Sequence, residues 1–414
     1  MEGGGVRAGA MNLSGMRRIL MLLLALLLLS TAAACGRSVE GESSGGVTQP
    51  LSTNITGGPG SSFVPAPPPP PSPTGGFGPV AVTPQRERAT VSSSADGSCW
   101  AAPPLTEYTL AGAGGSPSSV AAAADGSVWF SDAGEAPAIG RLDPTGAVTR
   151  YPLPAGRRPG PLAVGPDGSV WFGTTGPAVG HLTPSGRLVG YATPTVEGPI
   201  KGPGPTPPGP FVAGPDGAMW FVEIAGDNVG RITSDGTISE YPLPSRDRMH
   251  ANPEGIAVGS DGAIWFSETL LMRMGRIDVR SHAITEFPIP PYPDGVAPAN
   301  VTAGRDGAIW FDGGEIGRMT TNGDFSKFSL PWQGQYAPTS ATAGPDGGIW
   351  MIDTRNGKVL RMTLQGATSE AAPVADPKGL YNGGLDQMSA GPDALWFAEP
   401  AVNRIGRYGC RPAV

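Results

Sequence analysis

The sequence predicts an all-β protein, a seven-bladed β-propeller with four-stranded antiparallel blades. The octet GPDGSVWF at residues 165–172 belongs to a set of seven related copies along the chain. The tryptophan of these copies recurs at intervals of roughly 40 to 50 residues, the length of one propeller blade. With 64 Gly and 47 Pro in 414 residues and no helical period, the chain is expected to form short strands joined by turns. The repeated tryptophans are Trp129, Trp171, Trp220, Trp265, Trp310, Trp350 and Trp396.

Each repeat is expected to supply four strands, a to d. In the fourth repeat these are residues 252–259, 263–268, 274–278 and 283–290. The Pro-Asp-Gly type of sequence between strands a and b is typical of a tight turn in which Gly takes a positive φ. Because both faces of strand b are apolar, each Trp is predicted to pack between neighbouring blades.

The last repeat lacks a strand d, and the N-terminal side of the chain offers a replacement. Residues 105–110 (LTEYTL) precede the first repeat and resemble the d strands at 238–243 and 284–289. We therefore expect this segment to complete the last blade, so that the N-terminal strand closes the ring.

Residues 1–35 are predicted to be a lipoprotein signal peptide. Arg17 and Arg18 precede the apolar stretch 19–34, which is followed at once by Cys35. The run AAAC that ends at Cys35 resembles the lipobox of bacterial lipoproteins, in which the Cys carries the lipid. An ordinary cleaved signal with an incidental Cys is the alternative. This interpretation predicts an extracytoplasmic protein that is anchored to the cell membrane as a lipoprotein.

The rest of the chain divides into a linker and the propeller. Residues 36–98 are rich in Pro, Gly and Ser and are predicted to be a disordered linker, with the propeller at 99–414. Cys99 and Cys410 flank the borrowed strand and the final strand c. With Cys35 assigned to the lipid, they are predicted to form a disulfide, two free thiols being the alternative.

Charge and composition limit the partners. The net charge is −7 and charged residues make up 15% of the chain, without a basic run, so nucleic-acid binding is excluded. We expect a monomer whose partners are the membrane, through the lipid anchor, and a small molecule or a surface partner that the sequence leaves unknown.

The repeat resembles a known family. Units that read P-x-G-I-A-x-G-x-D-G-x-x-W-F-x-E, then N-x-x-G-R-I, then I-x-E-Y-P-L-P look like those of the virginiamycin B lyase (streptogramin lyase) family over roughly residues 100 to 410. The resemblance implies a seven-bladed propeller. It also implies a magnesium-dependent elimination that opens the ester of cyclic streptogramin B antibiotics.

The chain departs from this family where the activity resides. The family's activity depends on histidines in P-H-G-I or P-H-A-I segments that enter strand a, together with a Glu after the W-F-T motif. The positions that match the histidine are Ser118, Gly160, Gly209, Glu254, Ala299, Thr339 and Asp386. Among the 3 histidines of the chain, only His250 is expected on the relevant face.

Carboxylates follow the W-F pair in most repeats and are the candidate ligand-binding residues. We expect them in the b-to-c loops, where they would approach a common rim. Clustered carboxylates suit Mg²⁺ or Ca²⁺, and a crowded carboxylate has a raised pKa and can accept a proton. These residues are Asp132, Glu223, Glu268, Asp353 and Glu399.

The cluster with the strongest prediction lies in repeats three and four. His250 and Glu254 are the catalytic candidates, and Glu223, Glu254 and Glu268 are the candidate metal ligands. In the alternative interpretation these acids are solvated, cap turns or pair with the strand c arginines. Those arginines are Arg231, Arg276 and Arg407.

Three functions remain open at this point. The first is a cell-surface lipoprotein that binds a ligand or acts as a scaffold. The second is a divergent enzyme, either a metal-dependent carbon-oxygen lyase of the virginiamycin B lyase type or a lactone hydrolase. The third is a purely structural propeller of the envelope. The fold does not choose among them, since propellers serve all three.

Overall fold

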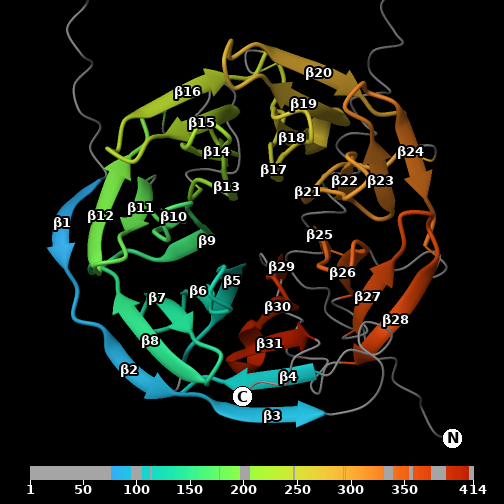
Figure 1. The fold of residues 1–414 in the computed structure, drawn as a ribbon. Helices are drawn as coiled ribbons and strands as arrows, with labels where there is room; N and C mark the ends of the chain where they lie inside the picture. Colours follow the sequence, from blue (N-terminus) through green and yellow to red (C-terminus); the bar gives the residue numbers. More distant parts are fainter. Residues whose placement is uncertain are drawn as a thin grey trace, which may run out of the picture. The chain divides into compact units, whose positions relative to one another are not determined.

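The computed structural model describes residues 76–94, 105–111, 114–176, 178–195, 206–245, 248–291, 293, 295–330, 339–353, 358–373 and 388–409. They belong to one compact unit, residues 71–414. In Figure 1 these residues form seven antiparallel blades arranged in a ring. The predicted fold class is confirmed, and the strand that begins each blade lies nearest the centre of the ring.

The blades are numbered here in chain order. Blade one consists of β5 (Pro117–Ala122), β6 (Val128–Asp132), β7 (Ala138–Leu142) and β8 (Ala147–Pro152). Blade two consists of β9 (Pro159–Val164), β10 (Val170–Thr174), β11 (Ala178–Leu182) and β12 (Arg187–Ala192). Blade three consists of β13 (Phe211–Ala213), β14 (Met219–Glu223), β15 (Asn228–Ile232) and β16 (Ile238–Pro242).

Blade four consists of β17 (Ile256–Val258), β18 (Ile264–Glu268), β19 (Arg273–Ile277) and β20 (Ile284–Pro288), close to the predicted strands. Blade five consists of β21 (Val301–Ala303), β22 (Ile309–Asp312), β23 (Ile316–Met319) and β24 (Phe325–Phe328). Blade six consists of β25 (Thr339–Ala343), β26 (Ile349–Asp353), β27 (Lys358–Met362) and β28 (Thr368–Pro373).

Blade seven is assembled from both ends of the described chain. Its strands are β29 (Met388–Ala390), β30 (Ala394–Glu399), β31 (Arg404–Gly409) and the N-terminal β4 (Leu105–Thr109). β4 pairs with β31 in antiparallel register, with Gly406 opposite Glu107. The prediction that residues 105–110 complete the last blade is therefore confirmed.

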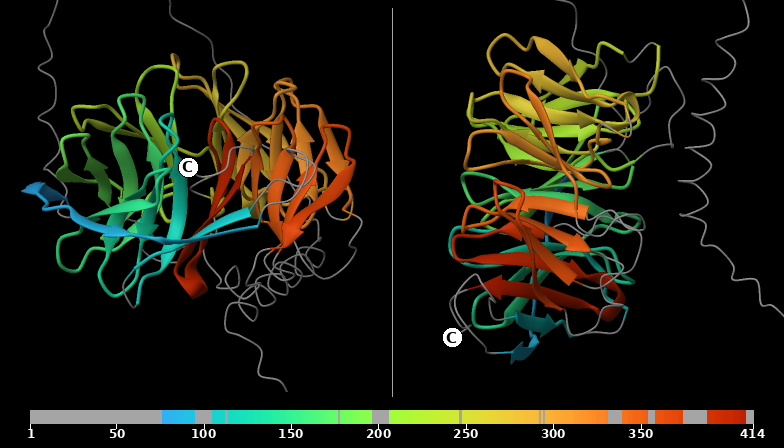
Figure 2. Two further views of the ribbon diagram at one scale, coloured as in Figure 1. Left: turned by 60° about the horizontal axis from the view of Figure 1, so that its bottom comes forward. Right: turned by 90° about the vertical axis from the view of Figure 1, so that its right-hand side faces the viewer.

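The linker prediction is wrong for part of its range. Within 36–98, three further strands form: β1 (Phe77–Ala81), β2 (Gln85–Arg88) and β3 (Thr90–Ser94). They pair with the outermost strands of blades two, one and seven (β12, β8 and β4), and Figure 2 shows them running along the outside of these blades. β1 (FGPVA) and β2 (QRER) gain backbone hydrogen bonds from an open sheet edge and expose most of their side chains, so neither carries an alternating apolar pattern. Composition therefore did not reveal them.

The apolar core lies between the blades, as predicted for the tryptophans. Trp220 of blade three packs with Ile264 and Phe266 of blade four in one buried cluster. Trp265, on the opposite face of β18, packs with Phe311 of blade five in another. Successive residues of strand b thus face alternate neighbours, which fixes the direction of every side chain at the end of that strand.

The repeated turn has a structural role. In blade three, Asp216 accepts hydrogen bonds from the Trp220 indole at 3.0 Å and from Arg231 Nε at 2.7 Å. Gly217 has a φ of 79°, as the turn requires. In blade four, Arg276 makes the same bond to Asp261 at 2.7 Å. Arg231 and Arg276 of strand c therefore bind the turn aspartates of their own blades, which corrects that part of the alternative interpretation for these two residues.

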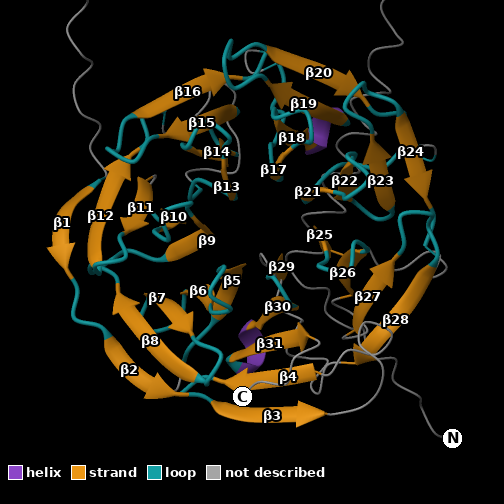
Figure 3. Ribbon diagram, viewed as in Figure 1, coloured by secondary structure: helices purple, strands orange, loops and turns teal. Residues whose placement is uncertain are grey.

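Helical structure is confined to single turns in the described part of the chain. Two 3₁₀ turns, η1 (Thr269–Leu271) and η3 (Pro400–Val402), follow strand b in blades four and seven (Figure 3). None of the described helices is long and apolar enough to cross a membrane.

Candidate functional site

The acidic side chains after the W-F pair lie at the ends of the b strands and are buried. They were expected in the b-to-c loops at a common rim, but they end the b strands and all are at most 8% exposed. The structure adds Asp312 of blade five, which the sequence analysis did not name. Asp312 follows Phe311 directly, so strand alternation points it toward blade six, where it accepts the backbone N–H of Ala341 at 2.8 Å. The buried acids are Asp132, Glu223, Glu268, Asp312, Asp353 and Glu399.

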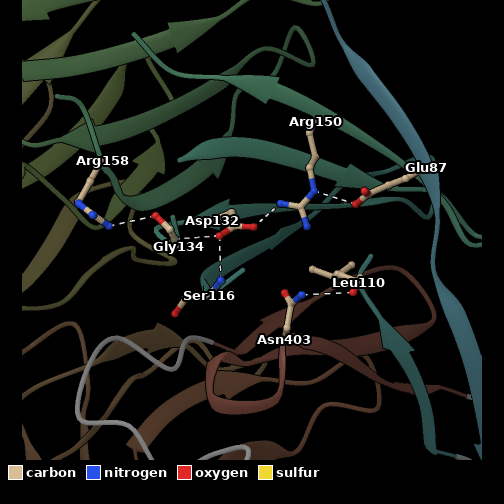
Figure 4. Close-up of polar contacts among 8 residues, drawn as sticks. All are labelled: Glu87, Leu110, Ser116, Asp132, Gly134, Arg150, Arg158 and Asn403. Atoms are coloured by element: carbon tan, nitrogen blue, oxygen red, sulfur yellow. Dashed lines mark hydrogen bonds and ion pairs between the residues drawn. The ribbon is translucent and has the colours of Figure 1, made fainter. Parts of the chain in front are cut away.

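Asp132 of blade one has a complete set of partners (Figure 4). Its Oδ1 accepts hydrogen bonds from the backbone N–H groups of Ser116 at 2.9 Å and Gly134 at 3.0 Å. Its Oδ2 pairs with Arg150, whose Nε lies 2.7 Å from Glu87 Oε1 on the outer strand β2. This acid therefore has a structural role.

Glu268 of blade four occupies the same place in its blade, but in a different environment. It is 0% exposed, and within the described part of the chain neither carboxyl oxygen has a hydrogen-bond partner. Burial, followed by the negative charge of Glu286, raises the pKa of Glu268 to about 8, although the charge of Arg273 opposes the shift. The carboxyl group is consequently neutral at physiological pH and able to donate a hydrogen bond.

An aspartate and a histidine lie at the same junction, between blades three and four. His250 Nδ1 lies 2.7 Å from Asp227 Oδ2. Asp227 is 1% exposed, and its Oδ1 accepts the backbone N–H groups of Ala251 and Asn252, each at 3.1 Å. The ring of His250 is thereby oriented, and its buried Nε2 has no hydrogen-bond partner among the described residues. The sequence analysis missed Asp227, which carries no motif.

Backbone hydrogen bonds bring Glu268 and the histidine segment together. Leu270 N donates to Ala251 O at 3.1 Å, and Glu268 lies two residues before Leu270. By strand alternation Glu268 points toward blade three, and the charge of Asp227 in that blade contributes to its raised pKa. Glu268 and His250, two of the four residues of the predicted cluster, therefore share one junction.

Exposed apolar side chains flank this junction. In the described part of the chain three large apolar side chains are exposed, namely Val80, Met249 and Leu270. Met249 is 58% exposed and precedes His250, whereas Leu270 is 49% exposed and follows Glu268 by two residues. We call Asp227, His250, Glu268, Met249 and Leu270 the blade 3–4 site.

The other two members of the predicted cluster lie elsewhere. Glu223 faces blade two, where it lines a small cavity with Thr193 and Thr195. Burial and the charge of Glu240 raise the pKa of Glu223 well above its usual range. Glu254 lies on the blade five side, near the buried Asp312. Burial raises the pKa of Asp312 to about 6, and the charge of Glu254 adds to the shift.

The predicted metal centre is therefore corrected. No group of three His, Cys, Asp or Glu side chains placed to hold a metal ion exists among the described residues. Glu223 and Glu268 end the b strands of successive blades and each faces the preceding blade, so they lie at different junctions. Glu254 precedes β17, and its charge acts on Asp312 of blade five.

Asp353 and Glu399 stand in strands next to a basic residue. Asp353 pairs in register with Lys358, and Glu399 with Arg404.

The predicted lipid on Cys35 and the predicted disulfide between Cys99 and Cys410 concern residues outside the part of the chain that the structure describes.

The fold and the site together define the class of protein. It is a seven-bladed propeller whose blades carry a buried acid at the end of strand b in six of seven cases among the described residues. The model of the virginiamycin B lyase family matches residues 97–251 and 211–414. The chain belongs to the virginiamycin B lyase family.

Solved structures agree with this assignment. A catalytically inactive variant of virginiamycin B lyase from Staphylococcus aureus, solved with quinupristin, is 31% identical, with a TM-score of 0.63, over 74% of this chain and 99% of that chain. A streptogramin B lyase is 29% identical, with a TM-score of 0.63, over 75% of this chain and 99% of that chain. A Lactobacillus plantarum protein, 14% identical with a TM-score of 0.51 over 70% and 96% of the two chains, shares the fold alone. No curated protein matches this chain.

Proposed function

We propose that the protein is a ligand-binding propeller, held at the outer face of the cell membrane by a lipid on Cys35. The ligand has an apolar surface and a hydrogen-bonding group, and it binds at the blade 3–4 site. One observation supports this most strongly. Two of the three exposed large apolar side chains in the described residues, Met249 and Leu270, flank a buried carboxyl group and an imidazole nitrogen that both lack partners there.

The energetics favour a functional interpretation of this site. A buried polar group without a partner reduces the stability of the fold by about 1–3 kcal/mol. Such a group is retained when it has a function, for example in binding a ligand. Exposed apolar side chains that gather at one place are likewise typical of a binding surface. Asp132, at the equivalent place in blade one, has hydrogen-bond partners for both of its carboxyl oxygens.

The chemistry of the two polar groups indicates what they bind. The neutral Glu268 carboxyl group donates a hydrogen bond. When His250 donates Nδ1–H to Asp227, its Nε2 is left as an acceptor. One donor and one acceptor fit an amide or a hydroxyl group, and the apolar flanks fit hydrophobic side chains of the same ligand. A peptide-like compound meets both conditions.

Quinupristin, the compound named with the Staphylococcus aureus enzyme, is the probe that tests this proposal. We expect calorimetry to detect quinupristin binding to the purified full-length chain. Met249→Ser and Leu270→Ser should each weaken binding by about fivefold to tenfold, since each removes roughly 1 kcal/mol of apolar contact. Val80→Ser, on the outer strand β1, is the matched control and should bind as the wild type does.

Two results would count against the binding site. Equal affinity in all three variants would place the compound elsewhere. The absence of any heat at millimolar quinupristin would favour a scaffolding or purely structural role.

A divergent lyase is the second candidate, and the pairing of His250 with Asp227 favours it. An oriented imidazole can act as a general base, and elimination requires removal of a proton beside a carbonyl group. Elimination opens the ring without adding water, so chromatography has to detect a product of unchanged mass. We expect no Mg²⁺-dependent opening of quinupristin. Opening that His250→Gln abolishes would instead establish the lyase, and a product heavier by one water would indicate a lactone hydrolase.

The membrane attachment has its own test. Cys35→Ala should release the protein from membranes and abolish labelling by a fatty-acid probe. Retention of the variant in the membrane fraction, with no label on the wild type, would contradict the lipid anchor.

A further inference from the structure

Blade two differs from the other six blades at one position of strand c. In all seven blades one residue of strand c stands opposite the repeated tryptophan, and in six of them it is an arginine. Each of these arginines forms an ion pair with the aspartate of its own turn, at N–O distances between 2.5 and 3.4 Å. In blade two the residue opposite Trp171 is His181. The six arginines are Arg141, Arg231, Arg276, Arg318, Arg361 and Arg407.

The ring of His181 is buried and lies flat against the tryptophan. His181 is 7% exposed, and its ring centroid lies 3.8 Å from that of Trp171, with an angle of 6° between the ring planes. Its buried Nε2 has no hydrogen-bond partner among the described residues. The turn aspartate of this blade, Asp167, accepts hydrogen bonds from the backbone N–H of Ser169 at 3.0 Å and from its hydroxyl group at 2.5 Å. A stack of two rings therefore stands where the other blades have an ion pair.

The surroundings of the imidazole favour its neutral form. Burial is the largest effect and lowers the pKa of His181 below its usual value of 6.5. The charge of Asp167 opposes this shift, whereas the charge of Arg187 on β12 adds to it. On the far side of the stack, Trp171 contacts Tyr191 and an apolar cluster that it shares with blade three. The ring is consequently neutral at physiological pH.

Arginine and histidine respond differently to acid at this position. Arginine keeps its charge at every pH that a protein normally meets, and the turn aspartate neutralises it. A protonated His181 instead places a positive charge and an unpaired N–H donor in a buried position, which is unfavourable until water reaches the ring. An opened form of blade two binds this proton more tightly than the folded form. The contribution of His181 to stability is therefore complete above pH 6.5 and is lost as the pH falls below that value.

Two strands lie between His181 and the outer edge of its sheet. The strands of this sheet follow the order β9, β10, β11, β12 and β1. His181 on β11 pairs with Val189 on β12, and the next residue, Gly190, pairs with Phe77 on β1. β1 is an edge strand and exposes most of its side chains. Separation of β12 and β1 from β11 would therefore admit water to the imidazole.

We propose that His181 is an acid-sensitive switch whose protonation loosens β12 and the outer strand β1 from blade two. The other six blades carry a positive charge at this position at every physiological pH, and blade two acquires one only in acid. The buried carboxyl groups of Glu268 and Asp312 respond in the opposite direction, since the folded protein holds their protons more tightly. The switch lies outside the blade 3–4 site and is independent of the ligand proposed there.

Hydrogen exchange of the full-length chain at pH 7 and pH 5 tests the proposal. We expect the protection factors of the amides in β12 and β1 to fall by about fivefold to tenfold from pH 7 to pH 5. His181→Arg introduces the residue type of the other blades and should abolish this fall. His181→Gln is neutral at both pH values and should also abolish it, which keeps the test decisive if the arginine does not fit.

His282→Asn is the matched control, because it removes an exposed histidine from a turn of blade four. His282 has a φ of 58°, a conformation that Asn tolerates. This variant should keep the acid-dependent fall in β12 and β1. NMR follows the proton itself. The chain has 3 histidines, so the ring resonance that is missing from His181→Gln identifies His181, and it should titrate below pH 6.5.

Three results would overturn the proposal. They are equal protection of β12 and β1 at both pH values in the wild type, a fall that both His181 variants retain, and titration of His181 at or above pH 6.5. The last result would mean that the folded protein stabilises the charged ring. The quinupristin assay depends on different residues, so either proposal can fail alone.

Discussion

Asp132 and Glu268 occupy the same place in blades one and four, and the chain treats them in opposite ways. Asp132 is paired with Arg150 and accepts two backbone N–H groups. Glu268 is as deeply buried, and its oxygens have no hydrogen-bond partner in the described part of the chain. The comparison teaches that a buried acid at the end of strand b is part of the repeat, and that its partners decide whether it serves the fold or a ligand.

The largest expected effect follows from removing the paired acid. Asp132→Ala leaves the Arg150 guanidinium and two backbone N–H groups without this partner in a buried place. We expect a loss of about 3–5 kcal/mol in the free energy of unfolding, measured by urea denaturation. A loss below about 1 kcal/mol would mean that the two blades do not differ in the way described.

Glu268 should instead make stability depend on pH. Its raised pKa means that the native state holds the proton more tightly than the unfolded chain, where the pKa is near 4.5. The contribution is therefore complete below pH 4.5 and is lost as the pH rises to about 8, with a slope of about 1.4 kcal/mol per pH unit. Buried Glu223 and Asp312 also have raised pKa values, so urea denaturation of Glu268→Gln should show a slope that is smaller by about 1.4 kcal/mol per pH unit and not a flat profile. An identical slope in both proteins would assign it to another group.

The outer strand β2 supports the structural acid from outside the ring. Glu87 contacts Arg150 Nε at 2.7 Å, and its side chain is 24% exposed. Because this pair is partly solvated, Glu87→Gln should cost only about 1 kcal/mol. Chemical denaturation measures the cost. A loss as large as that of Asp132→Ala would show that β2 and not Asp132 neutralises Arg150.

The smallest effect on stability is expected at the surface of the blade 3–4 site. Met249 is 58% exposed, so Met249→Ser should change the free energy of unfolding by no more than about 0.5 kcal/mol. Thermal melts beside the quinupristin titration check this. A large destabilisation would mean that Met249 belongs to the packing of the fold and that its effect on binding is indirect.

The repeated octet was sufficient to predict the fold. Its spacing gave seven blades, and residues 105–110 were identified as the strand that closes the last one, because local pattern and turn chemistry agree throughout the repeat. The outer strands β1 to β3 escaped prediction. They pair with strand edges that only the finished ring provides, and neither β1 nor β2 has an alternating apolar pattern that would mark it as a strand.

The site was harder to predict than the fold. Glu268 and His250 were named from their positions, but their separation from Glu223 and Glu254 follows from which neighbouring blade each side chain faces. Motif analysis did not identify Asp227, because an aspartate in a turn is common and carries no signal by itself. Its contact with His250 of the next loop becomes apparent only in the folded structure. Tertiary contacts of this kind depend on the closed ring, which the sequence specifies only indirectly.

The titration of Glu268 tests the central claim most directly. Carbon-13 labelling of the glutamate carboxyl groups allows each to be followed by NMR as the pH is raised, and the resonance missing from Glu268→Gln identifies Glu268. The structure predicts a pKa of about 8, shifted further when quinupristin binds. A pKa near 4.5 in the folded protein would show that Glu268 is charged and paired at neutral pH, as Asp132 is, and would contradict the account.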